Sequence, residues 1–94
     1  MNSKQRAKLR ALANGIDTIL QVGKGGLSAE LVKQVDDALE ARELIKLRAL
    51  DNSSVTPKEA AEQIAEATRS EVVFVMGTRF VLYRKSVKNP TIVI

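Results

Sequence analysis

The segment Gly23-Lys24-Gly25-Gly26 has the composition of a loop that binds phosphate groups. Glycines lack a Cβ atom, so a phosphate oxygen can come close to the backbone N–H groups of such a loop. Lys24 would add a mobile cation at the same place. A helix that begins after the loop would add further N–H groups and the positive end of its dipole. GxxG loops of this kind clamp the backbone of single-stranded RNA in KH modules.

The spacing of these glycines is not specific by itself, because a glycine-rich turn between a strand and a helix has the same pattern. The chain contains neither the GxxxxGK[ST] pattern of P-loops nor the GxGxxG pattern of dinucleotide-binding folds. The interpretation as a phosphate site therefore depends on the lysine in the loop and on the charge of the rest of the chain.

Basic residues gather at both ends of this 94-residue chain, whose net charge is +4. The first ten residues contain four bases and no acid, and so do residues 79–88, whereas residues 30–71 contain six bases and ten acids. This asymmetry suits a polyanionic partner, although an ordinary solvated surface fits the charges equally well. Besides the loop, the bases that we expect to contact RNA are Lys4, Arg6, Lys8, Arg10, Arg84 and Lys85.

Four of these bases lie on a predicted first helix that begins with a cap at Ser3 and ends near Ala13. Lys4 and Arg6 would lie in its first turn, where the helix dipole disfavours cations. Like charges four residues apart also destabilise this helix slightly. An anionic ligand would explain this local cost, as would simple tolerance of it at a surface.

The composition excludes several other kinds of site. The chain has no Cys and no His, which removes disulfides, thiolate metal sites, the commonest general base and the commonest metal ligand. We therefore expect no enzyme activity, no cofactor and no metal. No apolar run reaches the roughly 18 residues of a membrane span, and the polar, basic start of the chain does not resemble a signal peptide. We expect a monomeric, cytoplasmic protein with no membrane partner.

Strand and helix signals alternate around the glycine loop. A strand over Ile16–Val22 leads into it, and a helix capped by Ser28 follows it. Glu43–Leu50 reads as a second strand, and Thr56-Pro57-Lys58-Glu59 as a capping box that begins a third helix. The glycine loop is thus predicted to join a strand to the N-terminus of a helix.

The last part of the chain predicts a hairpin. Its strands are Glu71–Met76 and Arg79–Arg84, joined by a type II′ turn at Gly77-Thr78. Within them, Val72–Val75 and Phe80–Tyr83 are nearly all apolar, as expected for strands covered on both faces. The order α-β-α-β-α-β-β indicates an α/β fold of the two-layer α+β type with one four-stranded mixed sheet. We expect a single domain over residues 1–94, with a tail at 89–94 that adds an edge strand or frays.

Two sets of side chains have uncertain roles at this level. Lys46 and Arg48 alternate onto one face of a strand, where they either line a basic surface or pair with Glu43 or Asp51. The aromatic residues of the hairpin either stack RNA bases or belong to the core, and the apolar character of both strands favours the core. These aromatic residues are Phe74, Phe80 and Tyr83.

Three motifs in this order resemble a known family, the CRM domain (chloroplast RNA splicing and ribosome maturation), and most closely its stand-alone bacterial members of the YhbY type. They are Val22-Gly23-Lys24-Gly25-Gly26-Leu27-Ser28, Arg42-Glu43-Leu44-Ile45-Lys46, and Gly77 through Val81-Leu82-Tyr83-Arg84. The resemblance covers nearly the whole chain, from Ser3 to about Lys88.

This resemblance implies a fold like the C-terminal domain of bacterial translation initiation factor three. It also implies RNA binding through the loop Gly23–Gly26 and the adjacent basic surface, and association with the ribosomal RNA of the large-subunit precursor. Two alternatives fit the residues less well. One is a protein-interaction module whose basic surface binds acidic proteins, and the other is an enzyme that relies on Lys or carboxylates. Contacts to phosphate alone would not distinguish RNA from DNA.

Overall fold

The computed structural model describes all 94 residues and contains seven elements in the predicted order. The helices are α1 (Ser3–Ala13), α2 (Ala29–Arg42) and α3 (Pro57–Thr68), and the strands are β1 (Thr18–Val22), β2 (Leu44–Ala49), β3 (Glu71–Met76) and β4 (Arg79–Tyr83). The strand order is β1-β2-β4-β3, with β1 parallel to β2 and the other two pairs antiparallel. The predicted four-stranded mixed sheet is confirmed.

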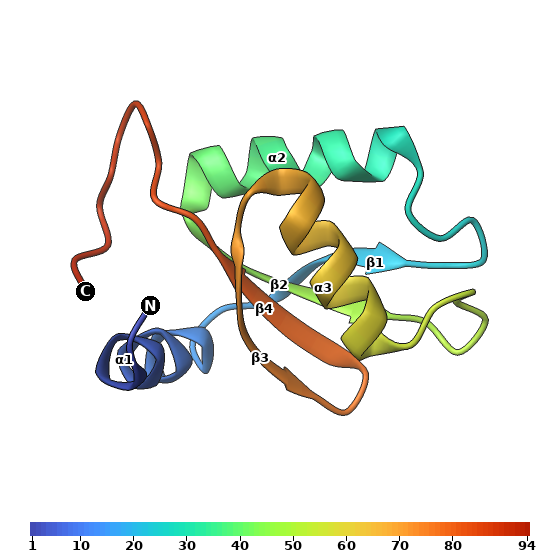
Figure 1. The fold of residues 1–94 in the computed structure, drawn as a ribbon, viewed down its shortest axis with the longest axis horizontal. Helices are drawn as coiled ribbons and strands as arrows, with labels where there is room; N and C mark the ends of the chain where they lie inside the picture. The colour runs from blue at the N-terminus through green and yellow to red at the C-terminus, as the bar shows by residue number, and fades with distance from the viewer.

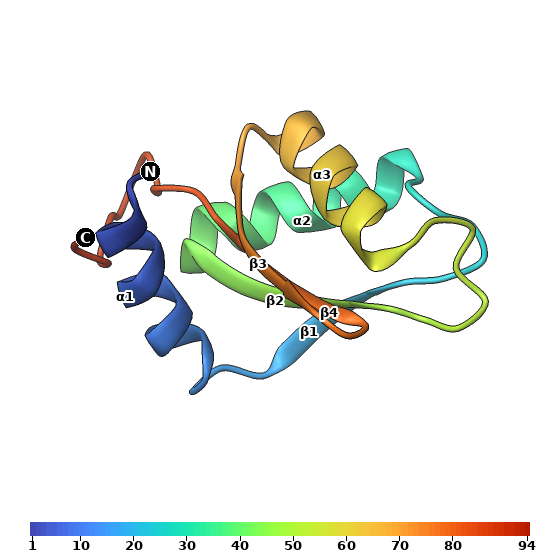
Figure 2. The ribbon, with the colours of Figure 1, turned by 60° about the horizontal axis from the view of Figure 1, so that its bottom comes forward.

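The helices lie on both faces of this sheet, as the two views in Figures 1 and 2 make clear. Helices α2 and α3 cover one face, over a core that includes Ile45, Leu47 and Phe80. Helix α1 packs on the opposite face, where Leu9 and Ala13 belong to a second, smaller cluster. Because α1 covers only one end of that face, it adds a partial third layer to the two that the sequence predicts.

The helix starts follow local capping chemistry. Ser28 caps α2, and Thr56 and Glu59 form the predicted capping box of α3. The predicted cap of α1 at Ser3 is wrong by one residue, because Asn2 is the N-cap. Asn2 and Gln5 bond reciprocally through side chain and backbone, at 2.8 and 3.1 Å. Gln at the third helical position completes a capping box, which a cap at Ser3 could not have done.

Strands β1, β2 and β4 are shorter than predicted, whereas β3 has the predicted bounds. Strand β1 begins at Thr18 because the N–H of Ile16 donates to Ala13 and continues the turn that closes α1. Strand β2 begins at Leu44 because Glu43, with φ +67°, is the C-cap of α2. The type II′ hairpin turn is confirmed, since Gly77 has a φ of +59° and Thr78 has no positive φ.

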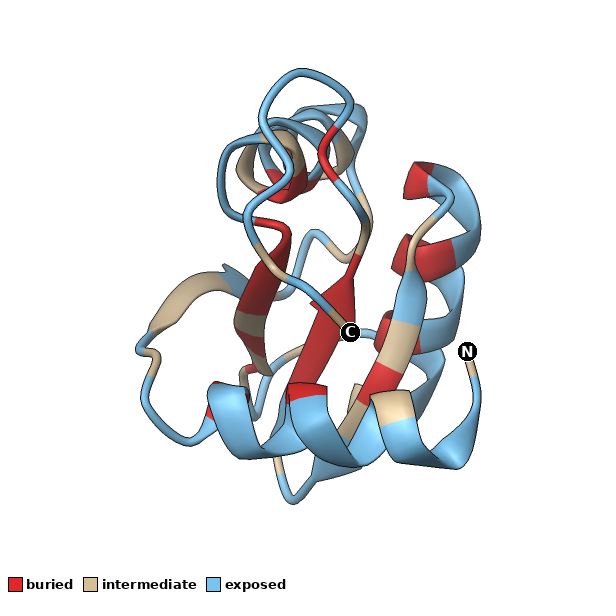
Figure 3. Ribbon diagram, turned by 90° about the vertical axis from the view of Figure 1, so that its left-hand side faces the viewer, coloured by how far each residue is buried: buried red, intermediate tan, exposed pale blue.

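The prediction that both hairpin strands are covered on both faces is correct for β4 and wrong for β3. Strand β4 lies inside the sheet and is buried from Phe80 to Tyr83. Strand β3 is an edge strand, and its last residues, Val75 and Met76, are exposed. The buried residues in Figure 3 accordingly lie on the strands and on the inward sides of the helices. None of the three helices has the length and apolar composition that a membrane span requires.

The C-terminal tail adds no strand, contrary to one of the two alternatives that the sequence suggests, and its backbone is bonded to a residue at the end of α2. The buried carboxylate of Glu43 accepts hydrogen bonds from the backbone N–H groups of Ser86, Thr91 and Ile92, at 2.9, 2.7 and 2.8 Å. Ile92 and Ile94 then pack against the cluster under α1. The tail is therefore held mainly by the carboxylate of Glu43, the C-cap residue of α2, while Glu40 accepts hydrogen bonds from the preceding residues Ser86, Val87 and Lys88.

Candidate nucleic-acid interface

The loop Gly23–Gly26 joins β1 to α2 at the right-hand end of the molecule in Figure 1. The N–H of Gly26 donates to the carbonyl of Gly23 at 3.0 Å, which closes a four-residue turn. Lys24 and Gly25 form its exposed tip, and their N–H groups donate no hydrogen bond within the protein. The turn therefore presents two unpaired donors and one lysine side chain to solvent.

The start of α2 adds to this group of donors. The side chain of Ser28 accepts from Leu31 at 3.1 Å, while the N–H groups of Ala29 and Glu30 have no acceptor in the protein. Such orphan donors and the helix dipole attract an anion. Glu30 is the one acid of this turn and opposes the attraction in part. The local chemistry is that of a backbone N–H cluster with a mobile cation beside it.

The three glycines of the loop differ in whether the fold would accept a larger residue in their place. Gly26 has a φ of +64°, and a Cβ atom there would lie 2.7 Å from the side-chain oxygen of Ser54, in the loop that joins β2 to α3. Gly23 has room for a Cβ, since the nearest atom would be 3.6 Å away. Nothing lies within 4 Å of a Cβ built at Gly25. Gly26 is thus required by the fold, whereas the side of Gly25 on which a Cβ would lie is open to solvent.

We expect Gly26→Ala to lower the free energy of unfolding by about 2 kcal/mol, because a Cβ atom strains the left-handed backbone and displaces Ser54. Gly25→Ala is the matched control, and its effect should stay below about 0.5 kcal/mol, as at ordinary exposed positions. Urea denaturation of both variants measures the difference. Equal losses at the two positions would show that the turn is held in some other way.

The bases of α1 lie at the opposite end of the molecule from this loop (Figure 1). The folded molecule is 35 Å long along its longest axis. Lys4 and Lys8 are exposed and form no ion pair. Arg6 donates to the backbone oxygens of Val72 and Val73, where β3 bulges. The unfavourable position of Arg6 in the first helical turn is thus offset by carbonyl oxygens of β3.

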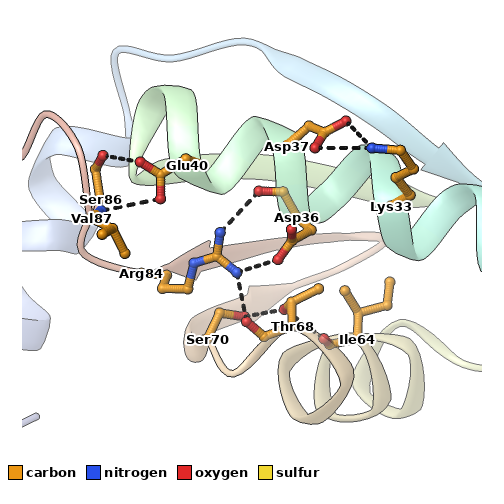
Figure 4. A network of polar contacts seen from close by, with 10 residues as sticks. All are labelled: Lys33, Asp36, Asp37, Glu40, Ile64, Thr68, Ser70, Arg84, Ser86 and Val87. Atoms are coloured by element: carbon orange, nitrogen blue, oxygen red, sulfur yellow. Dashed lines mark hydrogen bonds and ion pairs between the residues drawn. The ribbon is translucent and has the colours of Figure 1, made fainter.

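Arg84, from the C-terminal motif, is also engaged inside the protein (Figure 4). Its guanidinium donates to the carboxylate of Asp36, to the backbone oxygen of Asp36 at 3.0 Å and to that of Thr68 at 2.8 Å. It thereby links the end of β4 to α2 and to the end of α3. Lys85, the next residue, is exposed and forms no ion pair.

Arg84→Gln should lower the free energy of unfolding by about 2 kcal/mol, because hydrogen bonds to charged groups contribute about 1.5–3 kcal/mol each and this side chain is only 20% exposed. Lys85→Gln removes the same charge one residue later and should have little effect on stability. Thermal and urea denaturation of the two variants provide the comparison. A pair of indistinguishable curves would mean that the three contacts of Arg84 contribute nothing measurable.

The predicted site residues therefore fall into separate groups. Gly23–Gly26 form one surface, the α1 bases lie at the other end of the molecule, and Lys85 is exposed just after β4. Arg6 and Arg84 are bonded internally. The structure also answers the question about Lys46 and Arg48. Neither pairs with an acid, and both lie on the sheet face that carries α1 at its other end. The alternation of side chains along β2 predicted that Lys46 and Arg48 share one face of the strand. It could not predict that α1 packs on the same face of the sheet.

Comparisons with known proteins extend these observations. The sequence model of the CRS1 / YhbY (CRM) domain matches residues 1–84. A Bacillus subtilis protein named a probable RNA-binding protein is 40% identical over 92 residues, covering 98% of this chain and 96% of its own. A Methanocaldococcus jannaschii protein with a similar name is 35% identical, over 89% of this chain and 63% of its own length. A solution structure of a Staphylococcus aureus protein, described as a candidate RNA-binding protein, superposes with a TM-score of 0.79 at 50% identity, covering 95% and 93% of the two chains.

Proposed function

The chain belongs to the CRS1/YhbY (CRM) domain family, and on this premise we propose that it binds RNA without catalysing a reaction. The observation that carries the proposal is the exposed tip of the loop, where two N–H groups lack an acceptor beside Lys24 and the open side of Gly25. Backbone donors and a lysine recognise phosphate groups without reading the bases. The names of the relatives support RNA as the source of these phosphates.

The remaining cations have two different roles in this proposal, because some are exposed and others are bonded inside the protein. Lys4, Lys8 and Lys85 are exposed and without ion pairs, and they make additional contacts to a large RNA that extends beyond the loop. Arg6 and Arg84 act as positioning residues, since their guanidinium groups are bonded to backbone oxygens. Because α1 and the loop Gly23–Gly26 lie at opposite ends of the folded molecule, contacts at both places favour a structured RNA over a short strand.

The RNA is, in this proposal, ribosomal RNA of the large-subunit precursor, and the protein is a cytoplasmic assembly factor that acts as a monomer without a cofactor. This finer assignment rests on the resemblance to stand-alone bacterial members of the family. A protein of this size that binds the phosphate backbone of RNA would hold or shield one RNA segment while other components assemble.

Ultraviolet cross-linking in cells tests the assignment. We expect the RNA fragments recovered with the protein to map mainly to the large-subunit precursor, with few from the small subunit. Fragments spread evenly over cellular RNA would contradict the ribosomal part of the proposal. Binding of purified protein to that RNA should weaken as salt rises, because each phosphate contact releases condensed counterions. A tight complex with an acidic protein that survives nuclease treatment would favour the protein-interaction function instead.

A further inference from the structure

The face of the sheet that carries α1 at one end is uncovered at the other end (Figure 2). Strand register determines which side chains lie there. Ile45, Leu47 and Phe80 belong to the core under α2 and α3, so the residues between them lie on the opposite face. The hydrogen bond from Nε of Arg79 to the hydroxyl of Thr18, at 3.3 Å, joins β4 to β1 on that face. The open sheet face, as we call it, consists of Thr18, Gln21, Lys46, Arg48, Phe74, Met76 and Arg79.

This open sheet face contains three cations and no acid, and the cations have no ion-pair partner. Arg48 on β2 lies directly opposite Arg79 on β4. Like charges in such a cross-strand pair destabilise a sheet. The Nε atom of Arg48 is also buried without a hydrogen-bond partner. Both features are unfavourable in the isolated protein, and an anionic ligand would relieve the repulsion between the two opposed cations.

An aromatic side chain lies beside these cations. Phe80 and Tyr83 are buried, as predicted for core residues, but Phe74 is half-exposed on the open sheet face. The guanidinium of Arg10, from α1, lies over the ring of Phe74, 4.9 Å from its centroid. An exposed guanidinium placed over a ring offers a second planar group on which an unpaired base can stack.

We propose that the open sheet face binds a single-stranded segment of RNA. Lys46, Arg48 and Arg79 hold its phosphates, and Arg10 on Phe74 stacks one of its bases. The inference rests on the proposed function in taking RNA as the ligand, but none of its residues belongs to the loop Gly23–Gly26. Gln21 on this face lies two residues before Gly23, so a strand that leaves the loop can continue onto the sheet.

The double variant Lys46→Gln/Arg79→Gln tests the phosphate contacts. We expect its affinity for a single-stranded RNA of roughly 4 to 16 nucleotides to fall about 10-fold at low salt. The slope of the logarithm of the binding constant against that of salt should fall by about 1.4, since each contact to a single strand contributes roughly 0.7. Its melting temperature should not fall, because removing one of two opposed cations relieves repulsion.

The matched control is Lys88→Ala/Asn89→Asp, which makes the same change of two charges in the exposed tail. If the sheet variant binds RNA as the control does, the open sheet face is only a solvated surface and the inference is wrong. Competition by poly-glutamate as strong as by RNA would also overturn it, in favour of an acidic protein partner.

The stacking contact has its own test. Arg10→Lys keeps the charge but removes the planar group. We expect this variant to bind the same RNA with about 5-fold lower affinity, which corresponds to the lower end of the range for one stacked base. Unchanged affinity would exclude the stack. A loop variant, Lys24→Ala/Gly25→Asp, separates the two proposals. If only the loop variant loses binding, the sheet inference fails and the loop proposal stands. If only the sheet variant loses binding, the loop proposal fails and the sheet inference stands.

Discussion

Replacing Lys24 by Ala and Gly25 by Asp together is expected to lower the affinity for RNA about 100-fold while leaving the protein folded. Hydrogen bonds to a charged group contribute about 1.5–3 kcal/mol, and 100-fold corresponds to about 2.8 kcal/mol. The variant removes the one cation of the loop and places a carboxylate where we expect a phosphate. A filter-binding or fluorescence titration with structured ribosomal RNA measures the loss.

The fold should tolerate both changes. Lys24 is exposed, no atom lies within 4 Å of a Cβ at Gly25, and Gly25 has no positive φ. The tail variant Lys88→Ala/Asn89→Asp carries the same net charge and controls for the general weakening of attraction to a polyanion. If the loop variant and the tail variant bind RNA equally, the loop is only a turn. A loop variant that unfolds would contradict the local geometry described above.

Glu43→Gln is expected to lower the free energy of unfolding by about 3 kcal/mol, the largest effect on stability that we predict. Only 1% of Glu43 is exposed, and its carboxylate accepts bonds from Ser86, Thr91 and Ile92. An amide has one oxygen instead of two and places an N–H₂ group against a donor. Urea denaturation measures the loss, and rapid hydrogen exchange at Thr91 and Ile92 should show that the tail is released.

The same carboxylate makes stability depend on pH. Burial raises the pKa of Glu43, but the backbone hydrogen bonds from Ser86, Thr91 and Ile92 outweigh it and lower this pKa from 4.5 to about 2. A pKa that is lower in the folded protein means that the contribution is fully present above about pH 4.5 and is lost as the pH falls through about 2. Wild type should therefore lose stability over this window.

Glu40 titrates in the same range. The hydroxyl of Ser86, followed by the backbone N–H groups of Val87 and Lys88, lowers the pKa of Glu40 to about 2. Glu43→Gln should therefore keep part of the acid dependence and lose the part that belongs to Glu43. Curves of stability against pH that run parallel for wild type and Glu43→Gln, between pH 4.5 and 2, would show that the carboxylate of Glu43 does not hold the tail through its charge.

Features set by neighbouring residues could be predicted from the sequence. The glycine loop between a strand and a helix, the capping box of Thr56 and Glu59 and the hairpin turn at Gly77 depend on side chains only a few positions apart. The apolar stripes of α2 and α3 likewise fix which faces enter the core. These signals are local, so a single sequence is enough to read them.

Features set by distant contacts could not be predicted in this way. Arg6 and Arg84 read as surface cations because their acceptors, on β3, α2 and α3, are 16 to 67 positions away. The capture of the tail by Glu43 spans more than 40 positions. The separation of α1 from the glycine loop depends on which face of the sheet α1 covers. The cations without internal ion pairs, on the loop and on the open sheet face, became distinguishable only after these internal contacts were known.

Nuclear magnetic resonance spectra of the ¹⁵N-labelled protein during titration with RNA test most directly that the loop grips the backbone. We expect the amide signals of Lys24, Gly25 and Ala29, whose N–H groups have no acceptor in the protein, to shift most as the complex forms. Lys85 and the tail should shift less. If RNA saturates the protein while the loop amide signals remain unchanged, the loop is not the binding site and the proposed mode of RNA binding is wrong.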